Sequence, residues 1–141
     1  MYTTKYNERS RKAAGDAAPG WIVRPRWRLS RGSRIALGPG KSELLEAIRR
    51  VGTISGAARH LGMSYRRAWL LVETMNSSFA RPLVQTSSWR KKGAVLTRDG
   101  ERVLALYRRL EEISLRSAKR PLTELRALLR KVPRASVRRA R

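Results

Sequence analysis

The chain has 141 residues, of which 33 are lysine or arginine and 10 are acidic, so its formal net charge at pH 7 is +23. Because such a charge opposes compaction unless it meets a polyanion, and because cations release counterions from phosphates, we expect a nucleic acid partner. The absence of cysteine excludes disulfides, thiolate zinc sites and cysteine nucleophiles. No apolar run approaches the ~20 residues of a membrane-spanning helix. No N-terminal stretch combines basic residues with an apolar segment, so we expect a cytoplasmic protein with no membrane partner.

The residue types that carry most enzyme chemistry are sparse. His60 is the one histidine, and we expect it to lie at the surface or to face a phosphate rather than to act in catalysis or bind a metal. Glu43 and Glu46 are spaced i, i+3, but no histidine or third acid joins them in sequence. No glycine-rich phosphate loop followed by Lys-Ser/Thr is present. We therefore predict a chain that is not an enzyme and needs no metal or cofactor.

The N-terminal part predicts an arm followed by a hairpin. Residues 1–20 are polar, rich in Ala and Gly and aperiodic, which is typical of a disordered basic arm. Polar and apolar residues then alternate over 26–29 and, more weakly, over 34–37, with a turn signal at 30–33. This pattern predicts a β-hairpin in which Trp27 and Leu29 cover a core face and the arginines face water.

A helix is predicted from about Ser42, after the chain-breaking residues 38–40. It ends at Gly52, and its apolar face comprises Leu44, Leu45, Ile48 and Val51.

Residues 53–78 predict two helices joined by a very short turn. Thr53 can cap the first helix, whose apolar face recurs at i, i+3, i+4 and i+7 (Ile54, Ala57, Ala58 and Leu61). Gly62 follows as the glycine that ends it, and Ser64 can cap the second helix. The buried face of the second helix is predicted to be Ala68, Leu71, Val72, Met75 and Phe79. This pattern is typical of a DNA-binding helix-turn-helix. On the motif alone, an ordinary helical hairpin with solvated arginines is the alternative.

The second helix of the motif is the candidate recognition helix. At its start the Ser64 hydroxyl and free backbone N–H groups can meet a phosphate. An arginine bonded to guanine O6 and N7 contributes about 1–3 kcal/mol of discrimination, and either Arg66 or Arg67 could read bases. Trp69 lies at the edge of the buried face, where packing is favoured over DNA contact. The candidate DNA contacts in these two helices are Arg59, His60, Ser64, Tyr65, Arg66, Arg67 and Leu70.

A second hairpin is predicted directly after the recognition helix, once Arg81-Pro82 has ended that helix. Its strands are residues 83–86 and 94–97, and its polar tip between them contains Arg90, Lys91 and Lys92. A basic hairpin in this position is a wing that can reach the sugar-phosphate backbone or the minor groove. A solvated loop is the alternative.

Thr97 can cap a long helix over residues 98–118. Such a helix is ~30 Å long, about the diameter of a small domain, so part of it should project. A projecting apolar face needs a partner, and the commonest partner is a symmetry mate. Packing of the whole face on its own core is the alternative. The candidate dimerisation residues are Val103, Leu106, Tyr107, Leu110 and Ile113, with Leu104 and Leu115 widening the face.

Residues 119–141 complete the chain with a short helix and a basic tail. The helix is predicted from Pro121, with Leu122, Leu125, Leu128 and Leu129 as its apolar face. The tail, from Arg130 onward, is rich in arginine and contains no acid.

Together these elements predict a mainly α fold with small β-hairpins. The fold is a winged helix-turn-helix DNA-binding domain over 21–118 with a long C-terminal dimerisation helix. Four segments occur together in this order: 52–58 (GTISGAA), 62–69 (GMSYRRAW), 73–76 (ETMN) and 93–100 (GAVLTRDG). Over roughly 27–117 the chain resembles the N-terminal DNA-binding domain of the ModE family, the molybdate-responsive transcriptional regulators. It resembles the N-terminal domain of LysR-type regulators more distantly.

The resemblance implies a homodimeric transcriptional regulator that binds double-stranded DNA. Typical ModE proteins continue into β-rich domains that bind molybdate, whereas the sequence after Ser117 is a short helix and an arginine tail. We therefore expect this chain not to bind molybdate.

A sequence-independent architectural nucleic-acid-binding protein is the competing interpretation, because the charge of +23 and the basic ends favour any polyanion. A regulator should bind one inverted-repeat duplex far more tightly than random DNA of equal length at physiological salt, and an architectural protein should not.

Overall fold

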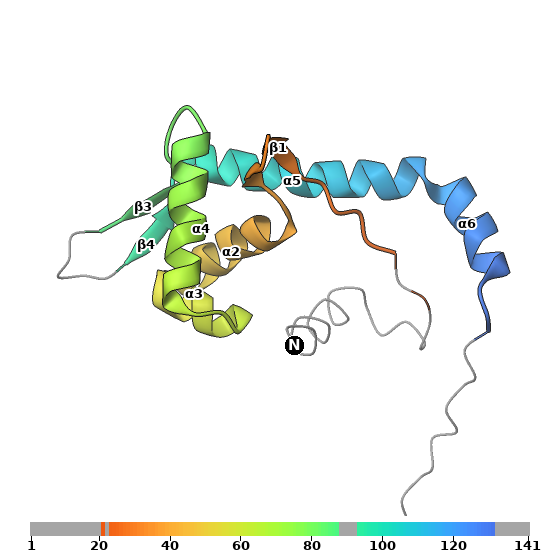
Figure 1. The fold of residues 1–141 in the computed structure, drawn as a ribbon, viewed down its shortest axis with the longest axis horizontal. Coiled ribbons are helices and arrows are strands. Elements are labelled where there is room, and N and C mark those ends of the chain that lie inside the picture. Colours follow the sequence, from red (N-terminus) through yellow and green to blue (C-terminus); the bar gives the residue numbers. More distant parts are fainter. Residues whose placement is uncertain (1–20, 22, 88–92, 132–141) are drawn as a thin grey trace, which may run out of the picture.

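A computed structural model gives the fold of the chain and describes residues 21, 23–87 and 93–131. The elements are, in order, β1 (Leu29–Arg31), β2 (Arg34–Leu37), α2 (Pro39–Val51), α3 (Ile54–Leu61), α4 (Tyr65–Ser78), β3 (Val84–Thr86), β4 (Ala94–Leu96), α5 (Arg98–Ser117) and α6 (Lys119–Leu128). Figure 1 shows α2, α3 and α4 packed together, with the β3–β4 hairpin beside α4 and α5 extending beyond this core. The order of elements is the one that the sequence predicts.

Several sequence predictions fall outside the described residues. They concern the basic arm over 1–20, the wing-tip residues Arg90, Lys91 and Lys92, and the end of the basic tail from residue 132.

The caps of the three core helices follow directly from the sequence. Gly52 and Gly62 end α2 and α3 with φ of +81° and +70°, in the left-handed region that glycine adopts at little cost. The Thr53 hydroxyl accepts a hydrogen bond from the backbone N–H of Gly56 at 2.9 Å. Helix α2 begins at Pro39 rather than at the predicted Ser42, because proline has the backbone angle of a first helical turn and lacks only an N–H that would have no partner there.

The hydrophobic core lies between α2, α3, α4 and the first half of α5. Ala68, Val72 and Met75 of α4 are buried as predicted, and Leu71 and Phe79 pack against them partly buried. The prediction for Val51 is wrong, since this side chain is 42% exposed. Val51 is the last residue of α2, and its Cγ1 would lie 2.5 Å from a Cβ placed on Gly56. It therefore covers the glycine of α3 from outside.

The N-terminal hairpin differs from its prediction. Its turn falls at Gly32, which has a positive φ of 59°, so residues 30 and 31 belong to β1. Trp27 and Leu29 do not cover the core; their exposed fractions are 45% and 42%. Trp27 precedes the strand, where the alternation of faces does not apply. The side chain that the hairpin does bury is Leu37, at 4% exposure.

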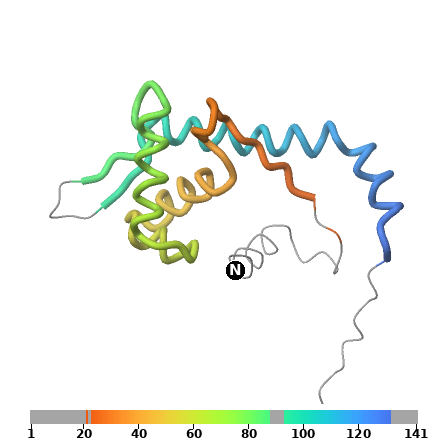
Figure 2. Tube along the Cα trace, in the orientation of Figure 1, coloured from red at the N-terminus to blue at the C-terminus, as the bar shows by residue number. Residues whose placement is uncertain are grey.

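The segment before β1 lies alongside α5, as Figure 2 shows. The Trp27 indole N–H donates to the Ser114 hydroxyl at 2.7 Å, and the Trp27 carbonyl accepts from the Tyr107 hydroxyl at 3.0 Å. Farther out, the Trp21 indole N–H donates to the carbonyl of Arg130 at 3.0 Å. These contacts, far apart in sequence, hold the N-terminal segment along α5 and α6.

The wing is an antiparallel pair in which Val84, Gln85 and Thr86 face Leu96, Val95 and Ala94 respectively. It is joined to the core by a hydrogen bond from the Ala94 N–H to the Gly52 carbonyl at 2.8 Å.

Helix α5 begins directly after the wing and forms ion pairs with α2. The Thr97 hydroxyl accepts from the Gly100 N–H at 3.0 Å, as a predicted helix cap should. Arg108 forms ion pairs with Glu46 of α2 and with Glu111. Burial lowers the pKa of Arg108, but the hydrogen bonds to Glu111 and Glu46 outweigh burial and raise it overall, so the bridge stays charged. The bridge joins α5 to α2.

Helix α6 begins at Lys119, two residues before the predicted start, since proline is tolerated in a first helical turn. None of its residues, all of which are described, is buried.

Candidate nucleic-acid interface

The start of α4 brings together four of the predicted contact residues. Tyr65, Arg66 and Arg67 form the first turn and are exposed, while Ala68 behind them is fully buried. The Ser64 hydroxyl oxygen accepts a hydrogen bond from the Arg67 backbone N–H at 3.1 Å. This bond leaves the hydroxyl proton of Ser64 able to donate to an anion. The positive end of the helix and the arginines therefore favour an anion at the same place.

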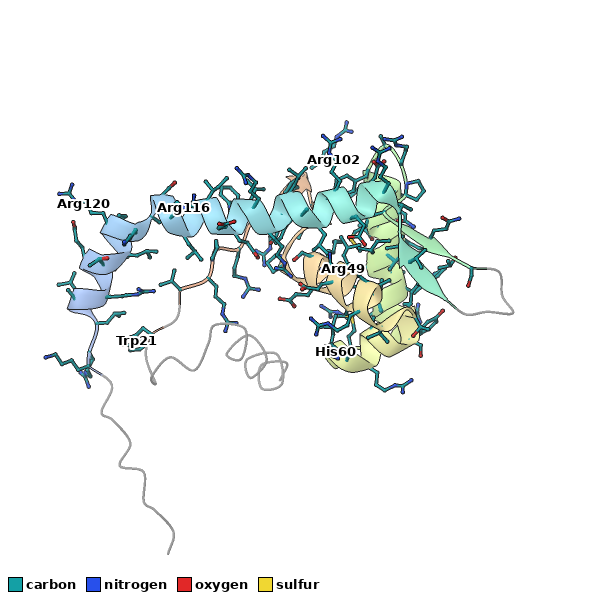
Figure 3. The ribbon with its side chains drawn as sticks, turned by 180° about the vertical axis from the view of Figure 1, so that it is seen from behind. Trp21, Arg49, His60, Arg102, Arg116 and Arg120 are labelled. Carbon is teal, nitrogen blue, oxygen red and sulfur yellow. The ribbon has the colours of Figure 1, made fainter. Side chains whose placement is uncertain are left out.

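Leu70 continues this exposed face, with half of its surface open to solvent. Arg59 is exposed and His60 half-buried, both in the last turn of the preceding helix, α3. Figure 3 shows His60 at the end of the molecule away from Arg102 and Arg116 of α5. The predicted contacts on α3 and α4 thus lie on the helix-turn-helix side, remote from the long helix.

A groove runs between the recognition helix and the wing. Its lining residues are Trp69, Val72, Glu73, Asn76 and Ser77 of α4 with Val84 and Thr86 of β3. The indole of Trp69 is 37% exposed. The sequence favours packing of Trp69 over DNA contact, and in the structure Trp69 is partly covered by the fold and partly open to solvent. Its exposed part faces the space beside the wing.

Asn76 sets the position of the wing, a role that is not predicted from the sequence. Its side-chain oxygen accepts from the backbone N–H groups of Leu83 and Val84 at 2.9 and 3.0 Å, and its amide nitrogen donates to the Val84 carbonyl at 3.0 Å. An amide is needed because both a donor and an acceptor are used. The partners lie seven and eight residues away across a turn, so no helical or strand spacing marks Asn76 in advance.

Acidic side chains are gathered away from the start of α4. Arg49 pairs with Glu101 at 3.2 Å and Arg81 with Asp99 at 2.6 Å, both at the start of α5. Further pairs lie along α5 and α6, including Arg116 with Glu112. These acids are paired with arginines within and between elements away from the start of α4, and the α4 N-terminus keeps a basic surface.

The described part of the chain meets neither the requirements of a metal site nor those of a membrane-spanning helix. No group of three or more His, Cys, Asp or Glu residues there could hold a metal ion. Of the helices described, none is long and apolar enough to cross a membrane.

The five candidate dimerisation residues of α5 separate into two sets. Tyr107 is 1% exposed and Val103 packs partly buried against the core, so both belong to the protomer's own interior. Leu106, Leu110 and Ile113 are 52%, 40% and 45% exposed and lie at i, i+4 and i+7. A surface for a second copy would consist of these three residues, which we call the α5 stripe.

Comparison with known proteins identifies sequence relatives over part of the chain. No protein-family model matches it. The molybdenum-pterin-binding protein MopA of Rhodobacter capsulatus is 41% identical over 85 residues, which are 59% of this chain and 32% of MopA. The molybdenum transport protein ModE of Azotobacter vinelandii is 42% identical over 91 residues, 63% of this chain and 33% of that protein. The DNA-binding transcriptional dual regulator ModE of Escherichia coli K12 is 39% identical over 77 residues, 53% and 29%.

The match with these relatives covers about a third of their length. Within that segment the resemblance to ModE is confirmed.

The fold also recurs among solved structures. The CbnR_DBD–DNA complex superimposes with a TM-score of 0.51 at 23% identity, covering 62% of this chain and 97% of that one. A structure of CbnR, a LysR family transcriptional regulator, matches with a TM-score of 0.47 over 58% of this chain and 27% of that one. The first likeness confirms the predicted fold class, a mainly α winged helix-turn-helix.

Proposed function

We propose that this chain is a sequence-specific, double-stranded-DNA-binding transcriptional regulator of the ModE type that acts as a homodimer. The observation that carries the proposal is the exposed first turn of α4, where Tyr65, Arg66 and Arg67 stand at a capped helix N-terminus. Sequence relatives that include a DNA-binding transcriptional regulator support it.

In this proposal, α4 is the element that contacts the base edges. An α-helix fits the major groove, and the N-terminal residues of a recognition helix meet base edges there. Arg66 or Arg67 would form paired hydrogen bonds to guanine, while Ser64 and Arg59 would hold phosphates that fix the register. The wing would place Arg90, Lys91 and Lys92 on the adjoining backbone.

The α5 stripe would join two protomers. Exposed leucine and isoleucine side chains over two helical turns are stabilised when a second copy covers them, at about 25 cal/mol per Å² of apolar surface. Because α5 is fixed to the core by Arg108, such a dimer would hold two α4 helices in one relative position. Two recognition helices on one face of a duplex read half-sites about one helical turn apart.

The sequence relatives favour the regulator over the architectural protein, because the names of several include transcriptional regulation. Such a regulator would work where the DNA is, which agrees with the cytoplasmic location that the sequence predicts. Molybdenum appears in the names of other relatives, which describe whole proteins of which this chain matches about a third.

Selection of bound fragments from a random duplex pool tests the proposal. The purified chain should enrich one inverted repeat whose half-site centres lie about 10–10.5 base pairs, or a multiple, apart. Recovery of unrelated fragments after repeated rounds, all bound with the affinity of the starting pool, would remove the sequence-specific function and leave the architectural one.

A further inference from the structure

Glu73 is an acid in an otherwise basic interface. It is the single acidic residue between positions 47 and 98, the stretch that holds the helix-turn-helix and the wing. It is exposed in the middle of α4 and lines the groove beside Trp69 and the wing. Seven residues, or two helical turns, separate it from Arg66, so both lie on the outer face of α4, opposite the buried Ala68 and Val72.

The carboxylate of Glu73 differs from the other described acids. Glu46, Asp99, Glu101, Glu111, Glu112 and Glu124 all form ion pairs with arginines, and Glu43 also has an interaction partner. The Ser77 hydroxyl donates a hydrogen bond to Glu73, but to its backbone carbonyl and not to its carboxylate. Among the described residues, its carboxylate is thus not engaged in an ion pair.

A negative charge on this face weakens binding to any DNA, because it repels phosphates. It favours binding only where it accepts a hydrogen bond from the DNA, since an ionised carboxylate has no proton to donate. The donors in the major groove are the exocyclic amino groups, cytosine N4 and adenine N6, and a Glu side chain suits cytosine N4. Guanine and thymine present acceptors there, which the carboxylate would repel.

We propose that Glu73 is a specificity-determining residue that accepts a hydrogen bond from an exocyclic amino group in the major groove, cytosine N4 first. The proposal rests on the proposed function, since it assumes that α4 lies in that groove. Arg66 and Glu73 are separated by about 10 Å along the helix axis at 1.5 Å per residue. Base pairs are about 3.4 Å apart. The cytosine should therefore lie about three base pairs from the position that the arginines read.

The inference is tested with Glu73→Ala, which removes the acceptor, and with Glu73→Gln, which removes the charge but keeps an amide oxygen that can still accept. Affinities are measured for the selected operator, for every single base-pair change within one half-site, and for a random duplex of equal length. Glu124→Gln is the control, because it removes an exposed charge on α6, far from α4 (Figure 1). Circular dichroism checks the fold of each variant.

The wild-type chain should prefer one cytosine, or one adenine, by about tenfold or more over the other bases at a single position. Glu73→Ala should lose most of that preference there and keep it elsewhere, because alanine has no acceptor, while its affinity for random DNA stays equal or rises. The base that the wild-type chain prefers at that position distinguishes cytosine from adenine.

Two results would overturn the inference. One is a full set of base preferences in Glu73→Ala. The other is an equal gain in affinity for operator and random DNA in Glu73→Gln and Glu124→Gln, which would make Glu73 a surface charge like any other. Absence of any operator preference in the wild-type chain is a separate result, because it contradicts the proposed function itself.

Discussion

Gly100 lies in the first turn of α5, where the helix passes directly over the backbone before the wing. A Cβ at this position would lie 2.1 Å from the Leu83 carbonyl oxygen and 3.0 Å from its carbon. Backbone atoms cannot move aside as the end of a flexible side chain can. Gly100→Ala should therefore lower the free energy of unfolding by about 1–3 kcal/mol, the usual cost of overpacking.

Gly40 provides the matched control for this prediction. It also lies in a first helical turn, that of α2, but a Cβ there would meet nothing within 4 Å. Gly40→Ala should leave stability unchanged or raise it by up to about 1 kcal/mol, because alanine loses less backbone entropy on folding. Urea unfolding followed by circular dichroism measures both. Equal midpoints for the two variants would show that Leu83 does not confine Gly100.

Ionisation of the Tyr107 phenol should make the free energy of unfolding depend on pH in the alkaline range. Its hydroxyl donates to the Trp27 carbonyl, and burial, with the nearby Glu111 adding to it, raises the pKa of the phenol above its usual 10.0. A raised pKa in the folded state means that the unfolded chain loses its proton first. The stabilisation is then fully present below pH 10.0 and is lost as the pH rises through the folded-state value.

Tyr107→Phe should remove both the hydrogen bond and this pH dependence. At neutral pH the variant should be less stable by about 0.5–1.5 kcal/mol, and the difference from the wild type should shrink above pH 10. Unfolding free energies at several pH values measure it, with the exposed Tyr65→Phe as control. A difference that stays constant or grows above pH 10 would contradict the placement of the phenol.

The sequence predicts the caps and the buried face of α4 well, because these depend on neighbours within one or two turns. Thr53, Ser64 and Thr97 each cap the helix that their spacing indicates. It does not predict Asn76 or the constraint on Gly100, since both depend on the backbone of residues 83 and 84 folded across a turn. Nor does it place Trp27, whose partner Ser114 is 87 residues away.

The long helix α5 performs two tasks on different faces. Leu104 and Tyr107 bury one face in the core at 2% and 1% exposure, while the α5 stripe remains open. Sequence periodicity alone merges the two faces, because both recur every three to four residues. Only the packing of α2 against α5 separates them.

The double variant Leu106→Glu with Leu110→Glu tests whether the α5 stripe makes the dimer. Both side chains are exposed in the single protomer, so the variant should fold normally. Two carboxylates in an apolar seam would lose hydration without a partner, and the chain should become monomeric. Sedimentation velocity measures the change. Ala105→Glu, on an exposed flank of the same helix, should leave the dimer intact, and a dimer that survives the double variant would point to another interface.

The arrangement of charge over the chain supports a division between holding DNA and reading it. Acids pair with arginines along α5, α6 and α2, whereas the start of α4 presents arginines at a helix N-terminus. Phosphate contacts hold any duplex alike, and base contacts distinguish one from another. The net charge of +23 alone predicts only the first of these.

Equilibrium binding to the selected operator and to random DNA of equal length, over a salt series, tests the central claim that α4 reads sequence. At least one of Arg66→Ala and Arg67→Ala should weaken operator binding by about 1–3 kcal/mol and affect random DNA much less. Lys91→Ala with Lys92→Ala should weaken both duplexes alike and reduce the slope of log affinity against log salt by about 0.9 for each lost phosphate contact. If instead every variant weakens both duplexes equally, α4 does not read sequence and the chain is an architectural protein.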